Sequence, residues 1–190
     1  MEDIFEIPLL KTKRILLRPF AISDVPELLV LMKDKEISDR TLYIPYPYTE
    51  ENAVDWIAAQ STDLEEQNGV VFAVTNLSGG ELMGAVGLTF VPKYNQAEMG
   101  YWLGKKFWNK GFTSEAAAKV LEYAFDEVKL KRVHAHYIIT NPASGKVMEH
   151  IGMKYEGTLR SHIIKNGEYT DIVMYGILKE DFNTLRKYNG

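Results

Sequence analysis

AEMGYWLGKKFWNKGFTSEA, residues 97–116, decides the fold because it carries the chain from a strand through a short loop into a helix. The letters QAEMGYWL predict a strand over Gln96–Leu103, with a glycine in its middle at Gly100. A mid-strand glycine suggests a bulge or the close approach of another backbone. The segment Ser114–Lys129 is rich in alanine and repeats its apolar residues at helical spacing, which predicts a helix. Gly111 lies in the loop between the two elements.

This loop has two interpretations that the residues alone leave open. The first N–H groups of a helix are unpaired, and the helix dipole makes them a site for anions. Gly111 permits a positive φ at which successive N–H groups converge, and Lys110 adds positive charge. Alternatively, Gly111 only allows a tight turn, and Thr113 or Ser114 caps the helix. The stretch lacks both G-x-x-x-x-G-K-[ST] and G-x-G-x-x-G.

A bulge near Met99–Gly100 would splay this strand away from the strand after the helix, Val133–Ile139. A gap between two parallel neighbours could admit a linear ligand that carries amide groups. Those amides could then bond to the free edge of the strand.

The rest of the chain predicts a mixed order of strands and helices, β-α-α-β-β-β-α-β-α-β-β, which is typical of an α+β or mixed-sheet domain. The predicted strands are Arg14–Pro19, two runs flanking Ser78–Gly80, Arg132–Thr140, Thr158–Ile164 and Tyr169–Leu178, the last two joined by an Asn166-Gly167 turn. The predicted helices begin at Asp24 with Pro26 in the first turn, at Thr49 and at Asn141, and the tail forms a last helical turn.

Length and composition indicate one globular domain over residues 1–190, with a core of about residues 14–182. The formal charge of −4 and the lack of a dense basic run argue against a nucleic-acid partner. There are no cysteines, which excludes disulfides and thiol nucleophiles. No segment is typical of a signal peptide or a membrane span, so we expect a cytoplasmic protein without a membrane partner.

Several polar and aromatic residues are candidates for a site. His134 and His136 share a strand face, but no third ligand is evident, so no metal site is predicted. Glu98 and Asp171 are either structural carboxylates or catalytic bases. Asn141 caps a helix, and Ser144 in the next turn either caps it or faces a ligand. A last set either lines a substrate mouth or packs a surface loop: Tyr43, Tyr46, Tyr48 and Trp56, around Pro45 and Pro47.

Taken together, AEMGYWLGKKFWNKGFTSEA and NPASGKVMEHIGMKYEGTLR (residues 141–160) resemble the GNAT superfamily of N-acetyltransferases, in its RimJ/RimL-like branch. The resemblance extends from RILLRPFAISDVPELL to DIVMYGILKEDF, almost the whole chain. It implies a central, mostly antiparallel, twisted sheet that is splayed between two parallel strands and flanked by about four helices.

The resemblance also implies that acetyl-CoA is the co-substrate and that no metal is needed. Its pyrophosphate would lie on the loop and first helical turn, its pantetheine along the preceding strand, and its thiol end at an Asn-x-x-Ser signature. The residues implied are Trp108, Asn109, Lys110, Gly111, Phe112, Thr113 and Ser114 for the pyrophosphate, Tyr101, Trp102 and Leu103 for the pantetheine, and Asn141 and Ser144 for the thiol end. Thr113 stands where the family usually has Gly or Ala.

By the same resemblance, an amine attacks the thioester directly in a ternary complex. Glu98 is the candidate base, and Ser144 is the candidate acid because Met148 occupies the position of the tyrosine found in many members. The acceptor would be a protein N-terminal amine or a small-molecule amine, and a homodimer is compatible with the family. The alternatives are a non-catalytic module that binds CoA or a protein partner, and a binder of nucleotides or phosphosugars.

Overall fold

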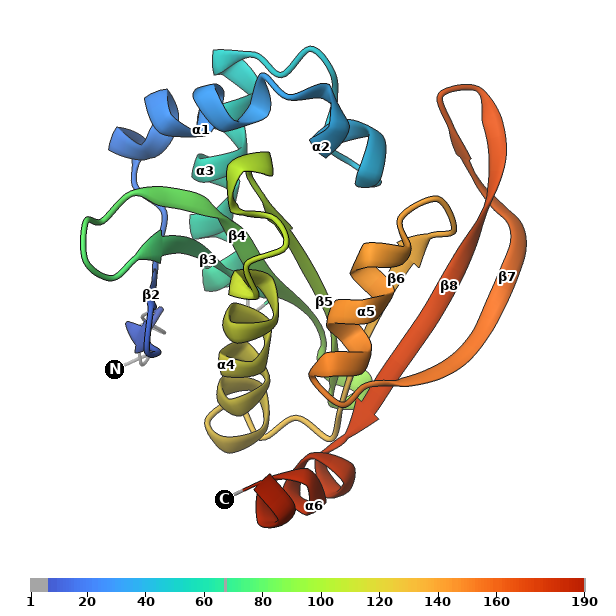
Figure 1. Cartoon of the computed structure of the whole chain (residues 1–190). Helices are drawn as coiled ribbons and strands as arrows, with labels where there is room; N and C mark the ends of the chain where they lie inside the picture. Colours follow the sequence, from blue (N-terminus) through green and yellow to red (C-terminus); the bar gives the residue numbers. More distant parts are fainter. Residues whose placement is uncertain (1–6, 67, 190) are drawn as a thin grey trace.

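A single eight-stranded sheet, in the order β1-β2-β3-β4-β5-β6-β8-β7, forms the centre of the molecule (Figure 1). The computed structural model describes residues 7–66 and 68–189. All neighbouring strands pair antiparallel except β5 and β6, which pair parallel, as the resemblance implied. The strands are β1 (Leu10–Lys11), β2 (Ile15–Arg18), β3 (Gly69–Asn76), β4 (Leu82–Val91), β5 (Gln96–Leu103), β6 (Arg132–Ile138), β7 (Lys154–Lys165) and β8 (Glu168–Leu178).

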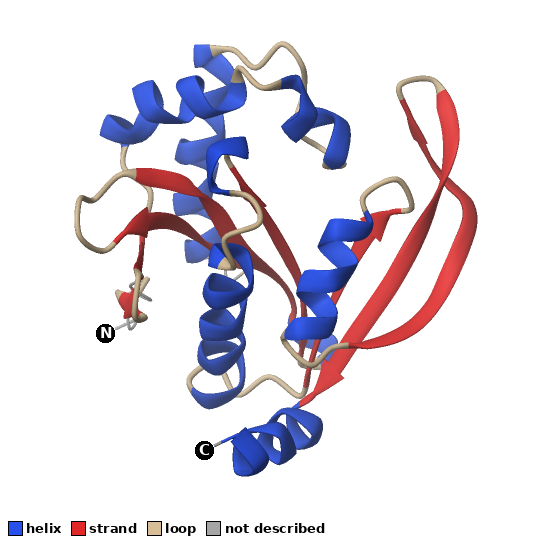
Figure 2. Ribbon diagram, in the orientation of Figure 1, coloured by secondary structure: helices blue, strands red, loops and turns tan. Residues whose placement is uncertain are grey.

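Helices cover both faces of the sheet, with α4 and α5 in front and α3 behind in the orientation of Figure 2. The helices are α1 (Val25–Met32), α2 (Lys35–Arg40), α3 (Glu50–Glu65), α4 (Phe112–Asp126), α5 (Pro142–His150) and α6 (Lys179–Asn189). Short 3-10 turns occur at Ile22–Asp24, Pro92–Tyr94 and Lys105–Phe107. The expected number of helices, about four, is too low because α2 was not predicted and α6 is longer than one turn. Among the described residues, no helix is long and apolar enough to cross a membrane.

The parallel pair is short, and this opens the sheet. Strands β5 and β6 pair only from Gln96–Arg132 to Glu98–His134. Beyond that point β5 continues to follow β4, and β6 continues to follow β8. Because each strand stays with its other neighbour while the sheet twists, the two diverge towards their C-terminal ends. The splay was expected, but the bulge near Met99–Gly100 is wrong, since β4 and β5 pair without a register shift.

Helix α4 packs against the opened sheet and anchors the loop before it. Its buried side chains include Ala117, Val120, Leu121 and Phe125, and each large apolar side chain buried in this way contributes about 1.5–3 kcal/mol to folding. Helix α4 begins at Phe112, two residues earlier than predicted. Because these side chains pack in the core, they hold the first turn of α4 in place next to the loop that contains Gly111.

Helix caps agree with the sequence in part. Thr49 caps α3 as expected, because its side chain accepts the N–H of Asn52. Asp24 stands at the N-cap of α1 but makes no capping bond. Its carboxylate instead accepts two bonds of 2.7 Å from the Arg18 guanidinium and one from the Ala21 N–H. Burial favours this pairing, because a carboxylate removed from water needs charged or N–H partners.

Candidate active site

The gap between β5 and β6 exposes a row of backbone groups on β5. The Gly104 N–H donates to a β4 carbonyl, and backbone groups alternate in direction along a strand. The N–H and C=O groups of Tyr101 and Leu103 therefore face the gap. The Leu103 C=O accepts a 2.7 Å bond from the Trp108 indole, so one of these groups is already used. Three residues of this strand were predicted to bind the pantetheine. Trp102, one of them, cannot do so through its backbone, because its N–H and C=O groups point towards β4.

The N-terminus of α4 is the second part of the site. Gly111 is its N-cap residue at φ 77°, and Asn109 also has a positive φ of 59°. The first helical bond is donated by the Glu115 N–H to Gly111 O. Within the described residues, no acceptor in the chain takes the N–H groups of Phe112, Thr113 and Ser114. Capping by the side chain of Thr113 or Ser114 is wrong, since no side-chain cap bond is made and both lie inside the first turn.

Arg14, which precedes β2, contacts this loop and braces it, although the two segments are far apart in the sequence. Its Nη1 donates to Lys110 O at 3.0 Å, its Nε pairs with Glu115 at 2.7 Å, and its guanidinium lies 4.3 Å from the Phe112 ring centre. Thr12 also donates to Glu115. Burial raises the pKa of Glu115, but these bonds outweigh it and lower the pKa. Sequence analysis missed Arg14, because no local pattern links residues 101 positions apart.

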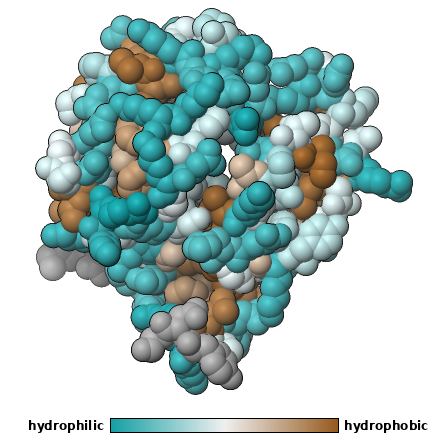
Figure 3. All heavy atoms as spheres, in the orientation of Figure 1, coloured by the Kyte–Doolittle hydropathy of each residue, from teal (hydrophilic) through white to brown (hydrophobic). Residues whose placement is uncertain are grey.

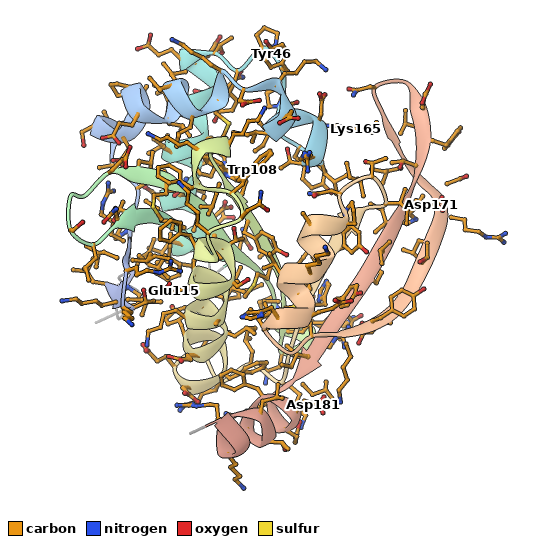
Figure 4. All side chains as sticks on the ribbon, in the orientation of Figure 1. Tyr46, Trp108, Glu115, Lys165, Asp171 and Asp181 are labelled. Carbon is orange, nitrogen blue, oxygen red and sulfur yellow. The ribbon has the colours of Figure 1, made fainter. Side chains whose placement is uncertain are left out.

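The end of α2 touches both arms of the gap. The Arg40 guanidinium lies 4.9 Å from the Trp108 ring centre, on the β5 arm. The Arg40 carbonyl accepts a 3.0 Å bond from Asn141 Nδ2, at the start of α5 on the β6 arm. Asn141 is the N-cap residue of α5, but its side chain makes no capping bond, contrary to the prediction. Trp108 lies between α2 and α4 in Figure 4.

Tyr101 and Ser144 form a hydrogen-bonded pair between β5 and α5. Ser144 Oγ donates to Tyr101 Oη at 3.0 Å, and Tyr101 Oη donates to the Ser144 carbonyl at 2.9 Å. Burial raises the pKa of the Tyr101 phenol, so the ring stays protonated and can keep donating. The prediction for Tyr101 concerned its backbone, and its hydroxyl was missed. Met148, at the position where the resemblance implies a tyrosine in many members, is 1% exposed and belongs to the core.

Glu98 lies at the last paired position before the strands separate. Its carboxylate lies 3.3 Å from His136 Nδ1 and 3.6 Å from His134 Nε2, which confirms that the two histidines share a face. Hydrogen bonding to His134 lowers the pKa of Glu98, and His136 adds to this effect against the opposing effect of burial. Asp171 is remote from this group and accepts the Ser161 N–H at 2.7 Å. In the described part of the chain, no three His, Asp or Glu residues are placed to hold a metal ion.

A cavity of about 340 Å³ opens between α2, the loop after it and the tip of the β7–β8 hairpin. Its lining residues are Lys35, Ser38, Asp39, Leu42, Tyr43, Ile44, Pro45, Tyr46, Ile164, Lys165 and Asn166. Tyr43 and Tyr46 thus line an opening, whereas Tyr48 and Trp56 pack against the core. The four aromatic residues therefore do not form one cluster, and a substrate-binding role for Tyr43 and Tyr46 stays a prediction. In Figure 4, Lys165 lies beside the lower end of α2.

Comparison with known proteins places this arrangement in a family. Residues 14–154 match the model described as "Acetyltransferase (GNAT) domain". The "Uncharacterized N-acetyltransferase YoaA" of Bacillus subtilis is 28% identical over 90% of this chain and 97% of its own. The "Putative ribosomal N-acetyltransferase YdaF" of the same organism is 36% identical over 71% of each chain.

Solved structures with the same fold support this assignment to the GNAT family. A GNAT-family acetyltransferase from Bacillus anthracis superposes with a TM-score of 0.81 at 28% identity, covering 91% of this chain and 99% of its own. RimL, an acetyltransferase of ribosomal L7/L12 solved with coenzyme A, gives 0.83 at 19% identity, with 90% and 98% covered, a likeness of fold. The chain is therefore an acetyltransferase and belongs to the GNAT superfamily, in its RimJ/RimL-like branch.

Proposed function

We propose that the protein transfers an acetyl group from acetyl-CoA to a primary amine by direct attack in a ternary complex. The observation that carries this proposal is the separation of β5 from β6 beyond Glu98 and His134. The β5 arm leads into the free N–H groups of α4, and Ser144 on the β6 arm bonds across the gap to Tyr101 of β5. The gap therefore offers an anion site and an amide-bonding edge in one line, which fits a long cofactor with a pyrophosphate and two amides.

The proposed cofactor contacts follow from this geometry. Residues Asn109–Ser114 would hold the pyrophosphate through backbone N–H groups and the α4 dipole. The free groups of Tyr101 and Leu103 would bond to the pantetheine amides. The thioester supplies an activated acyl carbon, and Ser144 lies at the arm where its sulfur would end. Figure 3 shows a hollow near the centre of this face, with hydrophobic atoms at its rim.

Glu98 is the proposed base. An amine must lose a proton to attack, and an α-amine has a pKa of about 8, so the required basicity is modest. The lowered pKa of Glu98 keeps its carboxylate anionic at neutral pH but makes it a weaker base, so it would hold the amine by its charge and pass the proton on to water. Gly100 lies on the same strand face as Glu98, and a Cβ built there would meet no atom within 4 Å. This leaves room for the acceptor beside the carboxylate.

The remaining steps need a hydrogen-bond donor that stabilises the oxyanion and a proton donor for the leaving thiolate. A backbone N–H among Met99–Tyr101 would stabilise the oxyanion. As the new C–N bond replaces the C–S bond, the thiolate takes a proton from Ser144 Oγ. Tyr101 accepts a bond from that hydroxyl and so holds Ser144 in position, and Ser144 regains a proton from the water that carries away the proton of the amine. The acceptor is a protein N-terminus or a small-molecule amine.

An acceptor screen with purified protein and acetyl-CoA, read by mass spectrometry and thiol release, tests the proposal. Glu98→Gln should lower kcat/KM by about 10²- to 10⁴-fold while leaving CoA affinity unchanged. Glu127→Gln, an exposed carboxylate at the end of α4, is the control and should keep full activity. Tight CoA binding without turnover of any amine would refute the proposed activity.

A further inference from the structure

We infer that the acceptor amine carries an anionic group, and that the cavity between α2 and the β7–β8 hairpin binds this group through Lys165. The inference rests on the proposed function, because it assigns the chemistry of the second substrate of the same site. Its support comes from the position of the cavity, the charges on its wall and its exposed apolar surface.

The cavity and the mouth of the gap adjoin opposite ends of α2. Arg40, the last residue of α2, contacts Trp108 and Asn141 at the two arms of the gap. Lys35, the first residue of the same helix, lines the cavity. At 1.5 Å per residue, the two positions lie about 7.5 Å apart along the helix axis. This is the span of two to three extended residues, so a small acceptor can reach from the gap into the cavity.

The charges on the cavity wall leave one cation without a partner. Lys35 pairs with Asp39 through bonds of 2.8 and 3.0 Å, which compensates that carboxylate. Lys165 makes no ion pair with any residue that the structure describes. Burial lowers the pKa of Lys165, Asp39 opposes this shift and Lys35 adds to it. A half-buried ammonium in this setting is stabilised by a bound carboxylate or phosphate, and a second cation is repelled.

The same cavity presents apolar surface to solvent. Tyr43 is 86% exposed, Ile164 62% and Tyr46 50%, and all three line the opening. Such surface favours an acceptor with an apolar or aromatic part next to its anionic group. A polyamine would meet Lys35 and Lys165 and find only Asp39, which is already paired.

Matched acceptors test the inference. We would compare Ala-Glu-Phe-amide with Ala-Gln-Phe-amide, and β-alanine with its amide, using purified protein and acetyl-CoA. Within each pair that reacts, the anionic member should have a kcat/KM at least about tenfold higher, as expected for one charge-assisted bond. Lys165→Met should remove this preference, and Lys165→Arg should keep it. Lys93→Met, an exposed lysine outside the cavity, should leave it unchanged.

Direct binding separates this inference from the proposed activity. The N-acetylated forms of the two peptides cannot react, and their affinities can be measured by calorimetry. Tighter binding of the Glu peptide to the unmodified protein than to Lys165→Met supports the cavity assignment, even without turnover of any amine. Equal binding of the Glu and Gln peptides, or a preference that survives in Lys165→Met, overturns it.

Discussion

Replacement of Gly111 by valine tests the anion site in α4 most directly. Gly111 holds φ at 77°, where a β-branched residue is strongly disfavoured. A Cβ built there meets only Arg14 Nη2 at 3.5 Å, which is ordinary contact, so the change acts through the backbone and not through a clash. The left-handed conformation costs about 1–2 kcal/mol for a residue other than glycine. In a domain of this size that lowers Tm by about 2–8 °C.

The effect on the cofactor should be larger than the effect on stability. If valine rotates φ out of the left-handed region, the N–H groups of Phe112, Thr113 and Ser114 no longer converge. A hydrogen bond to a charged group contributes about 1.5–3 kcal/mol. Loss of one such bond to the pyrophosphate therefore weakens CoA binding by about 10- to 150-fold. Calorimetry with CoA measures this change, and circular dichroism shows whether α4 stays folded.

Gly80→Val is the matched control. Gly80 has φ 70° in the β3–β4 turn, and a Cβ there meets no atom within 4 Å. Its replacement therefore imposes a similar backbone cost far from the site, with unchanged CoA affinity. Equal CoA affinities for Gly111→Val and Gly80→Val, at similar losses in Tm, would refute the assignment of the pyrophosphate to this loop.

Three other substitutions have defined outcomes. Arg14→Met removes the brace on the α4 loop and should weaken CoA binding by about three- to tenfold in calorimetry, whereas Lys13→Met beside it should not. Ser144→Ala should lower kcat by about 10²-fold with little change in the KM for acetyl-CoA, because it removes the proposed acid; unchanged kcat in thiol-release assays would exclude Ser144 from that role. Asp24→Asn should cost about 3 kcal/mol of unfolding free energy at pH 7 in urea titrations. Burial raises the pKa of Asp24, but its Arg18 and Ala21 bonds outweigh this and leave it lowered, so its stabilisation is present above the unfolded pKa of about 3.9 and is lost as pH falls towards the folded value. The Asn variant should therefore lose less stability than the unmodified protein on acidification below pH 4.

Local sequence patterns predicted the structure correctly in segments whose backbone conformation is set by neighbouring residues. The β5 strand was predicted with its observed bounds, and the Asn166-Gly167 turn has the positive φ values expected of a tight hairpin. The positive φ that the sequence suggested for Gly111 is confirmed, and the use of the α4 loop as an anion site stays a prediction. In each case the residues that decide the conformation are neighbours in the sequence.

Contacts between distant segments were not predictable. Helix α2 has only six residues, too few for a periodic pattern, yet it bridges the two arms of the gap. The hydroxyl of Tyr101 meets Ser144 because β5 and α5 are brought together by the fold, 43 positions apart. The predicted bulge failed for a related reason. A glycine in the middle of a strand suggests irregular pairing, but Gly100 lies in a regular strand and leaves open space on one face.

The brace at Arg14 has a consequence for how the chain holds together. β2 lies one strand from the β1 edge of the sheet, and such edges open locally at a lower free energy than the centre. Because Thr12 and Arg14 bind Glu115 and the Lys110 carbonyl, opening of this edge also releases the loop. A ligand that binds only the ordered loop therefore stabilises the N-terminal edge by mass action. On the proposed assignment, the free CoA concentration sets how often this part of the chain becomes accessible to proteases and to amide hydrogen exchange.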